Sequence, residues 1–292
     1  MVIGAGNLAT HLAPALQEAG HRILQVFSRT EESASALASR LSCGWTTEVE
    51  QITPRAEVYI FSVRDAVLEE LARRVYDHLK SLSGQGTTSS PADGDVPAAN
   101  STSSPANSDI PAPATPATGA DALFVHTAGS MSMEVLPSPR RGVLYPMQTF
   151  SRSRAVRFRE IPVFVESPTD ESLLLALASQ LSARACALDG ERRRLLHLAA
   201  VFACNFVNHM YDLADGILTG AGLPFDVMLP LIDETARKVH QLRPRQAQTG
   251  PAVRYDRNVM ERQIELLPDG QDRLIYELLS KSIHDRLQLD KD

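Results

Sequence analysis

The stretch MVIGAGNLATHLAPAL, residues 1–16, decides the fold, because it joins a short apolar strand to a helix through Gly4, Ala5, Gly6, Asn7 and Leu8. Glycines at such a turn let backbone N–H groups approach a pyrophosphate at the N-terminus of the following helix. Ala9 stands where the usual pattern has its third glycine, and alanine is tolerated there because the position only needs close packing of helix on strand. The stretch therefore predicts the start of a βαβ unit that binds a dinucleotide.

The strand before this turn is short, since only Met-Val-Ile precedes Gly4. A typical strand has about five to six residues. We therefore state the hypothesis that the natural chain begins upstream of Met1.

Strand-like and helix-like segments alternate through the first half of the chain. We expect strands at residues 22–28, 58–63, 123–126, 143–145 and 161–165, and helices at residues 8–19, 31–41 and 66–79. This alternation predicts an α/β fold with a Rossmann-type, doubly wound parallel sheet.

The end of the second expected strand carries Ser28, Arg29 and Thr30. An NAD site usually has an acidic residue here for the ribose hydroxyls, but the first acids, Glu31 and Glu32, come later, in the helix. A guanidinium flanked by two hydroxyls suits a 2′-phosphate. The turn therefore favours NADP(H) over NAD(H); the alternative is an ordinary polar turn with a surface arginine.

Residues 81–120 break the pattern, because they contain prolines and small polar residues but no aromatic residue, lysine or arginine. Such a segment buries too little apolar surface to offset its ordering entropy, so we interpret it as a disordered low-complexity insertion. From about residue 190 the chain is helical, with helices expected at 192–215, 225–242, 259–266 and 271–287. We therefore predict a nucleotide-binding domain at 1–189 and an all-helical domain at 190–292.

The helix expected at residues 192–215 is apolar nearly all round, which predicts that it is buried. At about 100° per residue, its polar exceptions fall within an arc of roughly 120°; they are His197, Asn205, Asn208, His209 and Asp212. This polar stripe either forms a helix–helix or dimer contact or lines a cleft against the nucleotide domain. In the second case His209 is a candidate acid or base, and Asn205 and Asn208 are candidates to orient a substrate.

Three further segments carry candidate site residues. His126 and Ser130 follow an expected strand, and Gln148 and Thr149 follow another, at the edge where open sheets bind ligands. Thr249 and Gly250 lie in a turn between expected helices. We expect Ser130, Gln148, Thr149, Thr249 and Gly250 to contact substrate. His126 is a candidate acid or base, and a structural histidine is the alternative.

Composition narrows the class of protein. The net charge is −6, which gives no indication of nucleic-acid binding. No apolar run reaches the length of about 18 residues that suggests a membrane span, and the N-terminus does not resemble a signal peptide. The three cysteines are widely spaced, which favours reduced thiols over a disulfide or a metal site. We expect a cytoplasmic protein without a bound metal.

Several motifs together resemble one family. They are GAGNLATHLAPAL, VFSRT, HTAGSMSMEVL, GVLYPMQTFS, HLAAVFACNFVNHMYDLAD, PLIDETARKV and QTGPAVRYD. The chain is similar to Rossmann-like proteins with a C-terminal DUF2520 domain, which are labelled NADP- or F420-dependent oxidoreductases. It is more distantly similar to pyrroline-5-carboxylate reductase, ketopantoate reductase and the β-hydroxyacid dehydrogenases.

The resemblance implies a phosphate loop at Gly4, Gly6, Asn7 and Leu8, and an NADP-type turn at residues 28–30. It implies that Ser62, Val63 and Arg64 pass under the nicotinamide ribose. It also implies a helical domain like that of 6-phosphogluconate dehydrogenase, which mediates a homodimer. The lysine that β-hydroxyacid dehydrogenases carry on the first interdomain helix is absent here; His197, Asn205 and His209 are the stand-ins.

These observations favour an NADP(H)-dependent oxidoreductase that acts on a C=O or C=N group of a small polar metabolite at the interdomain cleft. NAD and F420 are the less favoured cofactors. The alternative is a catalytically silent NADP-binding sensor or interaction module.

Overall fold

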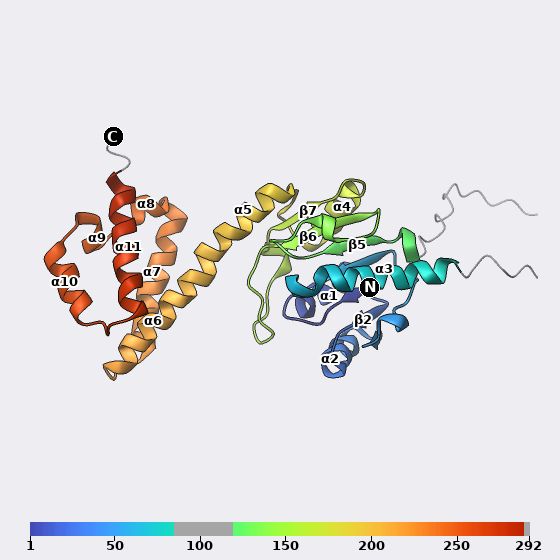
Figure 1. Ribbon diagram of the computed structural model, residues 1–292, viewed down its shortest axis with the longest axis horizontal. Helices are drawn as coiled ribbons and strands as arrows, with labels where there is room; N and C mark the ends of the chain where they lie inside the picture. Colours follow the sequence, from blue (N-terminus) through green and yellow to red (C-terminus); the bar gives the residue numbers. More distant parts are fainter. Residues whose placement is uncertain (85–118, 289–292) are drawn as a thin grey trace, which may run out of the picture. The chain divides into compact units, whose positions relative to one another are not determined.

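The computed structural model describes residues 1–84 and 119–288, and the chain divides into two compact units, Met1–Val201 and Phe202–Asp292 (Figure 1). The first unit is built around a sheet, and the second is helical. The domain boundary predicted after residue 189 stays a prediction.

One eight-stranded sheet forms the centre of the first unit, in the order β3-β2-β1-β4-β5-β6-β7-β8. The strands are β1 (Val2–Ile3), β2 (Gln25–Phe27), β3 (Gly44–Thr46), β4 (Val58–Phe61), β5 (Leu123–His126), β6 (Arg141–Pro146), β7 (Val163–Glu166) and β8 (Ala185–Ala187). All neighbours are parallel except β6 and β7. The Rossmann-type order of the first six strands confirms the predicted fold. The antiparallel β7 corrects the expectation of a wholly parallel sheet.

Five helices belong to the first unit: α1 (Ala9–Glu18), α2 (Glu31–Leu41), α3 (Asp65–Gly84), α4 (Glu171–Leu181) and α5 (Gly190–Ala200). Helix α3 continues five residues beyond its expected end at residue 79. A 3₁₀ turn, Gly119–Asp121, precedes β5. The rest of the predicted insertion, residues 85–118, lies outside the described residues.

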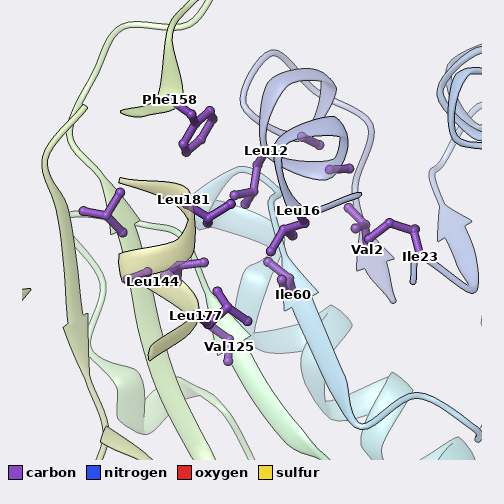
Figure 2. Close-up of a cluster of buried hydrophobic side chains, with 14 of the residues drawn as sticks. Val2, Leu12, Leu16, Ile23, Ile60, Val125, Leu144, Phe158, Leu177 and Leu181 are labelled. Atoms are coloured by element: carbon purple, nitrogen blue, oxygen red, sulfur yellow. The ribbon is translucent and has the colours of Figure 1, made fainter. Parts of the chain in front are cut away.

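Successive strand residues point to opposite faces of a sheet, and this alternation builds two apolar cores. Val2 packs in a cluster with α1, α2 and α4, where Leu16, Ile60 and Leu177 meet (Figure 2). Its neighbour Ile3 packs in the other cluster, with side chains of α3. The sheet is therefore covered on both faces, as a parallel sheet requires.

The second unit contains α6 (Val207–Gly220), α7 (Leu229–Gln241), α8 (Pro244–Ala247), α9 (Pro251–Arg254), α10 (Arg257–Glu265) and α11 (Gln271–Gln288). Helices α9 and α11 pack together, and the rings of Tyr255 and His284 stack with their centroids 4.3 Å apart. The helical character predicted for this half is confirmed. None of the helices in the described residues is long and apolar enough to cross a membrane.

The second unit buries little apolar surface within one chain. Among its described residues, only Leu218 and Ala252 are buried hydrophobic side chains. Many others are exposed, for example Phe202 (62%), Leu231 (62%) and Leu278 (68%). The burial expected for the helix at residues 192–215 is therefore not found in a single chain. That helix is also divided, because a π-helical turn, Val201–Phe206, separates α5 from α6.

Candidate functional site

A cavity of about 850 Å³ lies at the carboxyl edge of the sheet of the first unit. Residues directly after β1, β2, β4 and β5 line it, together with the end of β6. Strand order reverses between β1 and β4, so the cavity lies where open α/β sheets bind ligands.

Gly4 and Gly6 have different tasks in the loop after β1. Gly4 has a φ of 110°, and a Cβ on it would lie 2.2 Å from the carbonyl oxygen of Ser62. A Cβ on Gly6 would meet no described atom within 4 Å, although Gly6 lines the cavity. The lack of a side chain at Gly4 therefore lets its backbone approach that of Ser62. The lack of a side chain at Gly6 leaves space for a ligand in the cavity.

Helix α1 begins directly after this loop, at Ala9. Ala9 is fully buried against the sheet core, as expected for the third position of the glycine pattern. The described helix has no acidic side chain in its first turn, so its N-terminal partial positive charge is not offset locally. The loop and helix end therefore fit an anion such as a pyrophosphate.

A segment far along the chain, residues 150–152, docks on the glycine loop. Asn7 donates from Nδ2 to the carbonyl oxygen of Phe150 at 3.0 Å. His11 donates from Nε2 to the carbonyl oxygen of Ser151 at 2.9 Å. The side chain of Asn7 is thereby used to hold this segment.

Arg152, from the same segment, donates from its guanidinium to the carbonyl oxygen of Ala5 at 2.8 Å. The carbonyl of Ala5 and the N–H of Gly6 belong to one planar peptide group and point in opposite directions. Arg152 therefore fixes the direction in which the Gly6 N–H points.

One end of the cavity is rich in cations and hydroxyls. Ser28 and Arg29 line it after β2, Thr47 lines it after β3, and Arg74 reaches it from α3. Arg74 makes a loose ion pair with Glu50, N to O 3.8 Å, on the β3 side of the sheet. Residue types that suit an adenosine 2′-phosphate therefore gather at the β1–β3 end.

The loop after β5 is held from within by His126, which is fully buried. Its Nδ1 accepts from the N–H of Ala128 at 3.2 Å, so Nε2 carries the proton and donates to the carbonyl oxygen of Ser132, also at 3.2 Å. Burial, and then the charge of Arg193, lower the pKa of His126 to about 4. The imidazole is therefore neutral at pH 7, and its contacts are those of a structural histidine.

Arg193, which belongs to α5 and not to the loop, also holds the loop after β5. Its side chain is 1% exposed, and Nη1 donates to the carbonyl oxygens of Ala128, Gly129 and Met131 at 2.8–3.0 Å. Nη2 donates to Glu166 at 3.1 Å. The buried charge is thus paired and hydrogen-bonded, as a buried guanidinium must be.

Tyr145, at the end of β6, meets His197 of α5 at the other end of the cavity. The hydroxyl of Tyr145 lies 3.1 Å from Nδ1 of His197, and both side chains line the cavity. Beside them, the hydroxyl of Ser130 donates to the carboxylate of Asp65. This end of the cavity therefore combines hydroxyls, an imidazole and a carboxylate.

The structure brings most of the predicted first-unit site residues together around this cavity. The lining residues are Gly4, Ala5, Gly6, Asn7, Leu8, Ser28, Arg29, Ser62, Val63, Arg64, Ser130 and Gln148. Thr30, His126 and Thr149 are not among the lining residues. Asn205, Asn208, His209, Thr249 and Gly250 belong to the second unit, and their roles stay predictions.

Two family models match the chain: residues 1–83 match "NADP oxidoreductase coenzyme F420-dependent", and residues 161–283 match the domain of unknown function DUF2520. A crystal structure of a candidate NADP oxidoreductase from Bacteroides fragilis is 46% identical, covering 97% of this chain and 96% of that one, with a TM-score of 0.79. This relative decides the family. The chain belongs to the NADP oxidoreductase family with a DUF2520 part.

Two more distant structures share the fold of this oxidoreductase. A Thermotoga maritima protein is 20% identical, covering 100% of this chain and 99% of that one, with a TM-score of 0.65. An imine reductase from Myxococcus stipitatus in complex with NADP⁺ is 15% identical, covering 98% and 92%, with a TM-score of 0.58. No curated protein matches the chain.

The prediction from sequence did not include several lining residues of this oxidoreductase, namely Thr47, Asp65, Arg74 and Tyr145, and it named His197 only as a stand-in for the missing lysine. Tyr145 and His197 are separated by 52 positions, so only the fold brings them together. For Asp65 and Tyr145 the sequence did contain one indication of a site. Both residues lie at the carboxyl ends of strands or just beyond them.

The two glycines give a first test. We expect Gly6→Ala to leave the melting temperature within about 2 °C but to weaken NADPH binding about tenfold, because its methyl group enters the open cavity. Gly4→Ala should instead destabilise the fold by about 1–3 kcal/mol, because it combines a positive φ with a backbone clash. Thermal unfolding and NADPH fluorescence titration measure both effects. Unchanged affinity in Gly6→Ala would contradict the assignment of the loop.

The buried His126 predicts a dependence of stability on pH. The unfolded chain protonates this imidazole near its ordinary pKa of 6.5, whereas the folded chain does so only near pH 4. This stability is present above pH 6.5 and is lost as pH falls towards 4. Between about pH 7.5 and about pH 5 the loss should be about 2 kcal/mol, measured by urea unfolding. In the His126→Gln control, whose amide does not titrate, this part of the loss should vanish; equal losses in both proteins would disprove it.

Proposed function

We propose that the chain reduces a C=O or C=N group of a small polar metabolite with NADPH, or catalyses the reverse oxidation. One observation carries the proposal: a single cavity joins a glycine loop, an arginine-bearing end and an end with hydroxyl, imidazole and carboxylate groups. Such a cavity can hold a dinucleotide at one side and a small polar molecule beside its nicotinamide.

The residues present fit NADP. The backbone of residues 4–8 would hold the pyrophosphate, and Ser28 and Arg29, which line the cavity after β2, would hold the 2′-phosphate. Ser62, Val63 and Arg64 would lie along the nicotinamide ribose. The bound nucleotide supplies the hydride. The chain's own groups orient the substrate and supply the proton.

The charge pattern after β2 supports NADP over NAD. Ser28 and Arg29 line the cavity there, and Glu32 lines a separate groove beside α1 and α2. A carboxylate that could bond the ribose hydroxyls of NAD is therefore not among the lining residues directly after β2. F420 stays the second alternative, and it is tested beside the nicotinamide cofactors.

For the substrate we propose Ser130 and Gln148 as contacts, because both line the cavity beyond the glycine loop. Binding of NADPH without turnover of any carbonyl or imine would favour the alternative function, a silent NADP-binding sensor.

We also propose that the second unit pairs with a second copy of the chain. Exposed Leu266 (84%), Leu274 (65%) and Leu278 (68%) support this, because large exposed apolar side chains within one unit are typical of an interface. The pairing would bury side chains that a single chain leaves in water.

Arg29 provides the test of the cofactor. In Arg29→Ala the dissociation constant for NADPH should rise about 10- to 100-fold, because a charge-assisted contact to the 2′-phosphate is lost. The dissociation constant for NADH should stay within about twofold, since NADH lacks that phosphate. Fluorescence titrations with NADPH, NADH and reduced F420 measure this. Arg40→Ala, in the separate groove, is the matched control. Equal weakening of NADPH and NADH would contradict the assignment.

Sedimentation analysis tests the pairing. The full chain should sediment as a dimer, and Leu274→Glu with Leu278→Glu should shift it to the monomer, because burying carboxylates in an apolar interface is costly. Leu173→Glu is the control, since Leu173 is a 48% exposed leucine on α4 of the first unit. A wild-type chain that is monomeric at all concentrations would disprove the pairing.

A further inference from the structure

The site contains a pair formed by Tyr145 and His197; the sequence named His197 as a stand-in for the missing lysine but gave no sign of its partner. The hydroxyl of Tyr145 lies 3.1 Å from Nδ1 of His197, and the two rings meet edge to face with centroids 6.0 Å apart. Tyr145 is 8% exposed, and His197 is half-buried. The pair therefore has one member enclosed by protein and one within reach of water.

The loop after β5 packs directly on this pair. A Cβ on Gly129 would lie 2.6 Å from Nδ1 of His197 and 2.8 Å from the ring of Tyr145, so a larger residue at this position would displace one or both rings. Arg193 fixes the carbonyl of Gly129 at 2.9 Å. The backbone of the loop thus holds the two rings in one arrangement.

The place of the pair in the cavity points to the nicotinamide end. In a doubly wound fold each half of the sheet binds one half of a dinucleotide. Arg29 and Arg74 gather at the β1–β3 half, and the glycine loop lies between the halves. Tyr145 is the last residue but one of β6, in the other half, where the nicotinamide and the substrate would meet.

Other groups at this end are less suited to donate a proton. Asp65 accepts a hydrogen bond from Ser130, so its carboxylate acts as an acceptor. His126 is buried, and both of its ring nitrogens have partners in the loop. Burial raises the pKa of Tyr145, so its hydroxyl keeps its proton at neutral pH.

We propose that Tyr145 is the proton donor of the reduction and that His197 returns a proton to it. This assignment rests on the proposed function. When the carbon of the C=O or C=N bond is reduced by a bound nucleotide, the Tyr145 hydroxyl would give its proton to the oxygen or nitrogen. The tyrosinate takes a proton from Nδ1 of His197 as Nε2 takes one from water, so the imidazole ends with as many protons as it began with. The net reaction consumes one hydride and one proton, and it leaves an alcohol or amine.

The experiment compares the wild type with Tyr145→Phe, His197→Asn and a control, Tyr76→Phe. Tyr76 is half-buried on α3 and packs its ring on Phe124, away from the lining residues. Asparagine leaves a polar group near the position of Nδ1 but cannot relay a proton from one nitrogen to another. NADPH affinity is measured by fluorescence. Turnover is measured by NADPH absorbance on a panel of small cyclic imines, aldehydes and 2-keto acids.

We expect Tyr145→Phe to lower kcat about 100-fold or more, the usual contribution of a positioned general acid, with NADPH affinity within about twofold of wild type. His197→Asn should lower kcat about tenfold, and Tyr76→Phe should behave as wild type.

The outcomes separate the two proposals. If the wild type binds NADPH but turns over no compound of the panel, the proposed reductase function fails. The assignment of Tyr145 as proton donor then fails with it. If the wild type is active and Tyr145→Phe keeps a third or more of its kcat, the function stands and the assignment of Tyr145 is wrong. Loss of NADPH affinity in Tyr145→Phe without loss of kcat at saturation also overturns it, because Tyr145 would then only hold the cofactor.

Discussion

The close approach of two backbone segments at Gly4 is the constraint on which the first unit depends. The N–H of Gly4 donates to the carbonyl oxygen of Phe27 at 2.7 Å, and the N–H of Ser62 donates to that of Ile3, also at 2.7 Å. These bonds join β1 to both neighbours at the point where strand order reverses. Because the Gly4 position has no room for a Cβ, the same contact places the glycine loop beside residues 62–64. The cavity thus follows from the way β1 pairs with β2 and β4 at the centre of the sheet.

The β5–β6 end of the cavity depends on four residues that lie side by side on neighbouring strands of the sheet. Strand register aligns Phe61 with His126, His126 with Val143, and Val143 with Glu166. Glu166 comes from the antiparallel β7, and its two oxygens accept from Arg193 and from the N–H of Gly190, which begins α5. The antiparallel strand therefore delivers the carboxylate that anchors both α5 and the buried guanidinium beside the β5 loop.

The sequence predicted those parts of the fold that have a local pattern. The glycine turn, the apolar strands around it and the amphipathic α2 each carry their own signal. Helix α4 was missed although it is apolar, and β3 and β8 have only three residues each, too few to show a period. The direction of β7 was not predictable, because strand direction depends on pairing rather than on the strand's own residues.

The residues of the candidate site likewise divide into those with a local sequence pattern and those placed only by the fold. The loop after β1 and the turn after β2 could be located because they are contiguous and chemically distinctive. Arg193, in contrast, reads as one of three consecutive arginines, and nothing local separates it from the exposed Arg192 beside it. Only the fold shows that the side chain of Arg193 turns inward to the three carbonyls of the β5 loop.

The cavity is also asymmetric in charge, and this asymmetry bears on the orientation of a dinucleotide. Arg29 lies at the β1–β3 half with Arg74, which pairs with Glu50, whereas Arg64 and Asp65 are neighbours at the other half and offset each other's charge. A doubly phosphorylated adenosine is favoured by the first half, whereas the offset charges of Arg64 and Asp65 give the second half no comparable attraction. The nicotinamide, which carries no phosphate on its ring, is then left at the half where Tyr145 and His197 meet. Charge and strand order thus favour the same direction of binding, although they arise from unrelated parts of the sequence.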